Sequence, residues 1–232
     1  MSSKKIILAI VEGPSDMESL DEVLNTLTES PAIKFAIVNG DILQQSGINS
    51  KNILIKIKNV IETYIEMYKL QKSDILRVIH LVDIDGVYID KGCVHLSQSD
   101  TIQYTNEGIY TKWTQSIIER NERKAALLNQ ISSKEKIWTN IPYSVYYFSC
   151  NLEWVLHNSF ENHTNEEKRD LAAAFAEKYK GNINQFISFI NTSDLIVNGS
   201  YKDTWEYIQN QKNCIERKSN FHLFVNEIVS CE

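Results

Sequence analysis

Short aliphatic runs that end in acidic turns constrain the fold of this chain more than any other feature of its sequence. One run covers residues 5–11 and is followed by Glu12, and another covers residues 78–82 and is followed by Asp83 and Asp85. Runs of this length, rich in β-branched residues and bounded by Gly or Pro, are typical of buried parallel strands. Ligands of open α/β sheets bind beyond the carboxyl ends of the strands. Three acids placed there predict a cation site, and Mg²⁺ or Mn²⁺ is the expected cation.

Helical patterns alternate with these runs. Ser15 and Glu18 fit a capping box that starts a helix after the first strand. A second strand is predicted at 33–38, a helix at 53–68 and a helix at 111–130, followed by a strand at 145–148. Residues 87–110 show no sustained period and are predicted to form an irregular loop. The resulting order indicates an α/β fold, a parallel sheet with helices on both faces.

The chain has 232 residues, which is enough for one large domain or for a domain with a helical appendage. Strand signals fade after residue 150, and the composition becomes helical. We therefore expect an α/β domain over residues 1–150 and a helical C-terminal extension, residues 151–232, packed on it.

Charge and cysteine usage narrow the function classes. The net charge of −6 argues against a protein that coats nucleic acid by global attraction, so any nucleic-acid contact is expected to be local or bridged by metal. The sequence predicts no export signal and no membrane span. The four cysteines, of which the last is Cys231, are scattered and form no CxxC pair. These features predict a cytoplasmic protein with reduced thiols.

Asp83 and Asp85 carry the strongest chemical signal. At positions i and i+2 of an extended segment, both side chains would point to the same face and could share one cation. Gly86 would permit a sharp turn and the close approach of a ligand. The alternative is that an acid at the end of a strand caps the next turn. Glu12 by itself is weak evidence, and its value comes from the shared location.

These residues resemble the Toprim domain shared by topoisomerases, bacterial primases and several nuclease families. The resemblance lies in Val11-Glu12-Gly13 with Asp16 and in Val82-Asp83-Ile84-Asp85-Gly86. It covers roughly residues 5–90 and includes the strand at 145–148. It implies that Asp83 and Asp85 bind Mg²⁺, and that Glu12 is a general acid/base or lies beside the metal. Asp16 matches an acid that often stands four positions after the glutamate, and Asp41 lies near the place of the second motif.

Two further groups of residues extend the predicted site. Asn151 and Glu153 lie in a segment similar to one in small bacterial Toprim proteins associated with anti-phage defence and in overcoming-lysogenization-defect nucleases. They could close the site, or Asn151 could simply cap a helix. The predicted helix 111–130 carries three basic residues within about one turn. They offer phosphate contacts if that face turns toward the metal, or else form a solvated helix face; they are Arg120, Arg123 and Lys124.

A rival resemblance concerns the same acids. The segment 81–87 is similar to the nucleophile motif of haloacid-dehalogenase phosphatases, in which the first Asp attacks phosphorus and the second is the acid/base. That motif normally lies on the first strand. Here a complete βαβα unit precedes it, and no later strand ends in a pair of acids. The order of the elements favours the Toprim resemblance.

Together these patterns predict a Mg²⁺-dependent nuclease that cleaves phosphodiester bonds of DNA or RNA and acts with a partner protein of a phage-defence system. The alternative from another class is a non-catalytic module that binds a nucleotide or nucleic acid. We expect Asp83→Ala and Asp85→Ala to abolish cleavage without disturbing the fold, because the two carboxylates repel each other in the metal-free protein.

Overall fold

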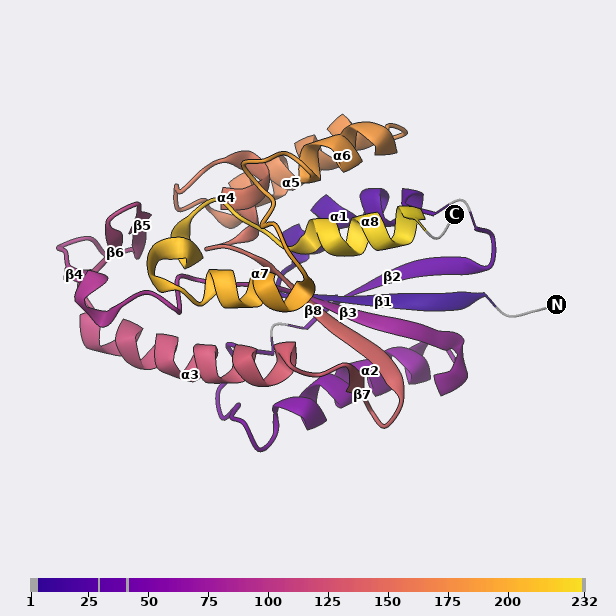
Figure 1. Ribbon diagram of the computed structural model, residues 1–232. Helices are drawn as coiled ribbons and strands as arrows, with labels where there is room; N and C mark the ends of the chain where they lie inside the picture. Colours follow the sequence, from indigo (N-terminus) through magenta and orange to yellow (C-terminus); the bar gives the residue numbers. More distant parts are fainter. Residues whose placement is uncertain (1–3, 29, 41, 231–232) are drawn as a thin grey trace.

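A five-stranded sheet with the order β2-β1-β3-β8-β7 forms the centre of the computed structural model, which describes residues 4–28, 30–40 and 42–230 (Figure 1). The first four strands in this order are parallel, and β7 is antiparallel to β8. The predicted α/β class with a mostly parallel sheet is therefore confirmed. The strands are β1 (Lys5–Val11), β2 (Ile33–Asn39), β3 (Ile75–Asp83), β7 (Lys136–Ile137) and β8 (Ile141–Phe148).

Helices cover both faces of this sheet. α2, α3 and α7 pack in one hydrophobic core, and α1, α4, α5, α6 and α8 pack in the other. The helices are α1 (Pro14–Thr26), α2 (Ile53–Met67), α3 (Thr114–Ser132), α4 (Leu152–His157), α5 (Asn165–Tyr179), α6 (Ile183–Ile190), α7 (Tyr201–Ile208) and α8 (Phe221–Ser230). Short 3₁₀ turns occupy Lys72–Asp74, Lys91–Cys93 and Gln211–Ile215.

Strand β1 shows why an unbroken aliphatic run becomes a central strand. Its side chains alternate between the two cores: Leu8 and Ile10 face the α2/α3 side, and Ile7, Ala9 and Val11 face the α1 side. All five are at most 1% exposed. A strand buried on both faces needs apolar residues at every position, which is why this segment shows no polar alternation.

The start of α1 differs from the prediction. Gly13, and not Ser15, is the N-cap, and Pro14 is the first helical residue. The carboxylate of Asp16 accepts the Gly13 N–H at 2.8 Å. Proline is favoured at this position because its fixed φ already suits a helix and its missing N–H would have no helical partner. Asp16 therefore holds the turn that contains Glu12.

The predicted irregular loop over residues 87–110 is also wrong. It contains most of a second sheet with the order β4-β6-β5: β4 (Val94–Leu96), β5 (Gln103–Thr105) and β6 (Gly108–Thr111). Strands of three or four residues are too short to show a period in sequence. Gly108 has φ +155°, and a Cβ there would lie 2.1 Å from the carbonyl oxygen of Cys93. Only glycine fits this position.

The predicted helical C-terminal region is confirmed, and its helices pack on both faces of the sheet, α7 on one and α4, α5, α6 and α8 on the other. α5 and α6 pack against α1, and α8 packs against β8 (Figure 1). Within the described ranges, no helix is both long enough and apolar enough to cross a membrane.

His80 is a neutral core residue of β3 and gives the first testable prediction. It is fully buried, and its Nδ1 lies 2.9 Å from the Tyr143 hydroxyl. Burial, with a smaller contribution from the charge of Lys124, lowers the pKa of His80 to about 3. Because this pKa lies below that of the unfolded chain, the stability due to neutral His80 is present above about pH 6.5 and is lost as the pH falls.

We expect this loss to reach about 3 kcal/mol at pH 4.5. His80→Asn, which keeps an amide for Tyr143 but does not titrate, should reduce the difference in unfolding free energy between pH 7.0 and pH 4.5. Urea unfolding of both proteins at the two pH values measures this difference. An unchanged difference would show that His80 does not account for it.

Candidate functional site

Acidic side chains at the ends of three neighbouring strands meet at the carboxyl-terminal end of the sheet. Glu12 follows β1, Asp83 is the last residue of β3, and Glu153 lies in the first turn of α4, just after β8. Since β1, β3 and β8 are adjacent and parallel, their carboxyl ends lie side by side. Glu12 is only 9% exposed and Glu153 only 4%. With Asp16 and Asp85 these residues form what we call the carboxylate cluster.

Asp85 does not continue the extended strand. Its φ is +51°, in the left-handed region. The prediction that Asp83 and Asp85 lie on one extended segment and point to the same face is therefore wrong. The backbone instead turns along the exit of β8, because the Asp85 N–H donates to the Cys150 carbonyl at 2.7 Å. A left-handed Asp costs on the order of 1 kcal/mol, and such strain is often found at functional sites.

Gly86, which follows Asp85, has φ +64°. A Cβ at Gly86 would lie 3.0 Å from Ile109 and 3.3 Å from Ile215. The close approach that this glycine permits is therefore to two side chains of the protein. Gly86 and these packed neighbours hold the turn that presents Asp85.

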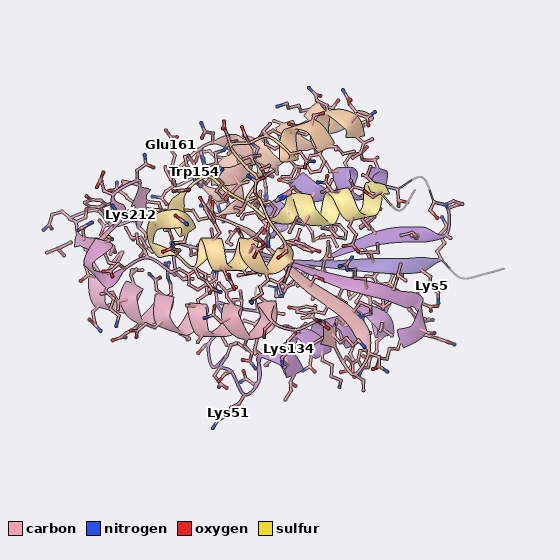
Figure 2. The ribbon with its side chains drawn as sticks, viewed as in Figure 1. Lys5, Lys51, Lys134, Trp154, Glu161 and Lys212 are labelled. Atoms are coloured by element: carbon pink, nitrogen blue, oxygen red, sulfur yellow. The ribbon has the colours of Figure 1, made fainter. Side chains whose placement is uncertain are left out.

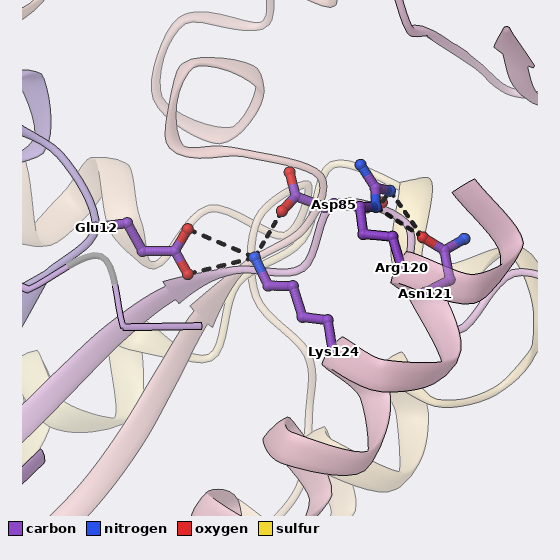
Figure 3. A network of polar contacts seen from close by, with 5 residues as sticks. All are labelled: Glu12, Asp85, Arg120, Asn121 and Lys124. Carbon is purple, nitrogen blue, oxygen red and sulfur yellow. Dashed lines mark hydrogen bonds and ion pairs between the residues drawn. The ribbon is translucent and has the colours of Figure 1, made fainter. Parts of the chain in front are cut away.

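Lys124 lies inside the cluster, between two of its carboxylates (Figure 3). Its Nζ is 2.6 Å from Asp85 Oδ2 and 3.4 and 3.5 Å from the two carboxylate oxygens of Glu12. The residue is 1% exposed. Burial would lower the pKa of Lys124, but the charges of Asp85, Glu12 and Asp83 outweigh burial and raise it, so the ammonium stays charged.

The other two basic residues of α3 lie in different surroundings. Arg120 donates from Nη2 to the Asp85 carbonyl oxygen and to Asn121 Oδ1, both at 2.8 Å (Figure 3). It therefore supports the backbone at Asp85. Arg123 is exposed on another side of the helix. The structure thus separates the predicted basic group, and phosphate contacts by Arg120, Arg123 and Lys124 stay a prediction.

Two aspartates of the cluster have raised pKa values. Burial, followed by the charges of Glu12, Asp16 and Asp85, raises the pKa of Asp83 well above its usual value. Burial raises the pKa of Asp16 to about 6. The hydrogen bond from Gly13 lowers this pKa, and the charge of Glu153 raises it. Negative charge is therefore in excess around Asp83, even with Lys124 present.

Glu153 is paired with a second lysine. Lys168 of α5 places its Nζ 2.8 Å from Glu153 Oε1, and the Lys168 side chain is 36% exposed. Asn151 is the N-cap of α4, where its side chain accepts the Trp154 N–H at 2.8 Å. The ring of Trp154, labelled in Figure 2, stacks on Phe160 with centroids 3.4 Å apart. Cap and stacking fix the first turn of α4, which carries Glu153.

The cluster has the ligand chemistry that Mg²⁺ and Mn²⁺ prefer, namely several hard carboxylate oxygens with excess negative charge. In the described part of the chain, no three His, Cys, Asp or Glu side chains are placed closely enough to hold a metal ion as they stand. The ammonium of Lys124 stands between Glu12 and Asp85. The residues fit a divalent ion in charge and donor type. An ion that binds here either shares Glu12 and Asp85 with Lys124 or uses the other carboxylates of the cluster.

Two parts of this site leave no signal in the sequence. Lys168 lies in a polar helix far from the strand ends, and only the packing of α5 brings it to Glu153. The burial of Lys124 also depends on how α3 packs. Asp41 and Cys231 lie outside the described residues. Cys93 and Cys150 are free thiols.

Comparisons with protein-family models, with curated proteins and with solved structures gave no match to this chain. The chemistry of the carboxylate cluster therefore carries the functional assignment.

Proposed function

We propose that this chain is a divalent-metal-dependent nuclease that hydrolyses phosphodiester bonds of DNA or RNA at the carboxylate cluster. The observation that carries the proposal is the meeting of the buried acids Glu12 and Glu153 with the half-buried Asp83 at the ends of β1, β8 and β3. Burial and the charges of Glu12, Asp16 and Asp85 raise the pKa of Asp83. Such an excess of buried negative charge is relieved by a bound cation. The resemblance to small bacterial Toprim proteins adds a role in phage defence with a partner protein.

The residues divide into two roles in this proposal. Asp83, Asp85 and Glu12 are the predicted ligands. A Mg²⁺ or Mn²⁺ ion held there would polarise the phosphate and stabilise the charge that develops on it. Asp16 is suited to move the proton of the attacking water, because a pKa of about 6 leaves it mostly ionised yet still basic near neutral pH.

A screen for metal-dependent cleavage tests the proposal. The purified protein is incubated with plasmid DNA, single-stranded DNA and RNA, with Mg²⁺ or Mn²⁺ and with excess EDTA. We expect cleavage of at least one substrate, with either metal, that EDTA abolishes. Glu12→Gln serves as the control against a contaminating nuclease and should be inactive. Metal-independent cleavage, or equal cleavage by this variant, would contradict the proposal.

One observation favours a second candidate, a module that binds a nucleotide or nucleic acid without cutting it. Lys124 already forms ion pairs with Glu12 and Asp85 without any added ion. This candidate predicts binding in the same screen, measured by fluorescence anisotropy, with no cleavage of any substrate. Turnover of a small phosphate ester, with trapping of a beryllofluoride adduct on Asp83, would instead support a phosphatase.

A further inference from the structure

Two lysines form ion pairs with members of the carboxylate cluster, and they differ in the free-energy cost of breaking those pairs. The side chain of Lys124 is 2% exposed, whereas that of Lys168 is 36% exposed. An exposed ion pair is worth little, so Lys168 can release Glu153 into solvent at small cost. Removing one partner from a buried pair leaves an uncompensated charge, so displacing Lys124 costs several kcal/mol.

The helix that carries Lys124 is firmly held. On α3, Ile117, Leu127 and Leu128 are buried in the core against the sheet. One turn before Lys124, Arg120 donates to the carbonyl oxygen of Asp85. Both the helix and the acceptor turn are thus held in place, and the side chain of Lys124 is buried between them.

From this contrast we propose that Lys124 takes the place of one of two divalent cations, so that the cluster binds a single ion at the carboxylates that Lys124 does not hold. Glu12 and Asp85 then serve the buried ammonium. The inference rests on the proposed function, from which it takes the divalent ion, and of the three predicted ligands it keeps only Asp83 for that ion. Lys124 acts as a positioning residue through the carboxylates that it holds.

Counting bound Mn²⁺ tests this assignment without any measurement of cleavage. Equilibrium titration followed by electron paramagnetic resonance should give one Mn²⁺ per chain for the parent protein. Lys124→Met removes the ammonium from Glu12 and Asp85 and should bind two Mn²⁺, with the signal broadened by coupling between neighbouring ions. Lys168→Met frees only Glu153 on the ion's own side, so it should still bind one Mn²⁺, about fivefold more tightly.

Two further variants separate charge from packing. Lys124→Arg keeps the positive charge and should bind one Mn²⁺. Lys124→Gln keeps a hydrogen-bond donor for Asp85 but carries no charge, so it should bind two Mn²⁺ per chain. It replaces Lys124→Met in the test if the methionine variant does not fold. Circular dichroism of each variant confirms that the count refers to folded protein. A merely structural lysine would change stability without adding a second ion.

The outcomes also distinguish this inference from the proposed function. Two Mn²⁺ in the parent protein, or one in folded Lys124→Met or Lys124→Gln, would overturn the inference and leave the nuclease proposal standing. One Mn²⁺ in the parent and two in these variants, without cleavage of any substrate, would support the inference and overturn the nuclease. No Mn²⁺ bound by the folded parent would overturn both.

Discussion

Lys124→Met should lower the free energy of unfolding of the metal-free protein by about 3–5 kcal/mol, the usual cost of breaking a buried ion pair by removing one partner. The substitution keeps the length and most of the volume of the side chain but removes the ammonium that lies 2.6 Å from Asp85 Oδ2. Glu12 and Asp85 then lose the ammonium that lies between them. Urea unfolding at pH 7.5 in the presence of EDTA measures the change.

Lys168→Met is the matched control for this measurement. It removes the same charge from another member of the cluster, but its side chain is 36% exposed. We expect a loss below about 1 kcal/mol. Adding Asp85→Asn to Lys124→Met should recover part of the lost stability, because the two substitutions act on one contact and are not additive. Equal losses for the two methionine variants would contradict the buried position of Lys124.

Asp83→Asn is expected to abolish cleavage and, at the same time, to stabilise the metal-free protein. Loss of a metal ligand should reduce the cleavage rate by about a thousand-fold or more. The gain in stability follows from the raised pKa of Asp83, which burial and three neighbouring acids cause. Because this pKa lies above that of the unfolded chain, the stability due to the protonated acid is present at low pH and is lost as the pH rises.

Asparagine has a similar shape but cannot ionise, so Asp83→Asn avoids this loss. Its stabilisation should therefore be larger at pH 7.5 than at pH 4, as measured by urea unfolding with EDTA. Mn²⁺ should raise the melting temperature of the parent protein more than that of the variant, because a ligand that binds the folded state stabilises it. Greater stability of the parent at pH 7.5 would contradict the charge excess around Asp83.

Asp85→Asn provides the contrast for Asp83→Asn. It removes a charge only two residues away, but it breaks the ion pair with Lys124 and should destabilise the metal-free protein. The sequence alone predicts one outcome for both aspartates, since two neighbouring carboxylates repel each other. The structure separates them, because only Asp85 has a buried counterion. Stability changes of the same sign would argue against this difference.

Much of the fold followed from local patterns. β1, β2, β3 and β8 lie where aliphatic runs predicted strands, because a strand buried on both faces needs apolar residues throughout. The helical C-terminal region was equally visible. Segments that depend on single backbone positions were not predicted. The Gly13 cap and the short strands around Gly108 depend on one or two residues and leave no periodic signal.

By itself, the sequence determined that acids stand at the ends of three strands. Parallel pairing of these strands then required Glu12, Asp83 and Glu153 to lie at the same, carboxyl-terminal end of the sheet. Only the tertiary structure decided how their charges are balanced. Lys124 is 112 residues from Glu12 along the chain and 39 from Asp85, and it reaches both through the packing of α3. The physical reason is that hydrophobic periodicity is a local property, whereas the neutralisation of a buried charge depends on which distant helix folds against it.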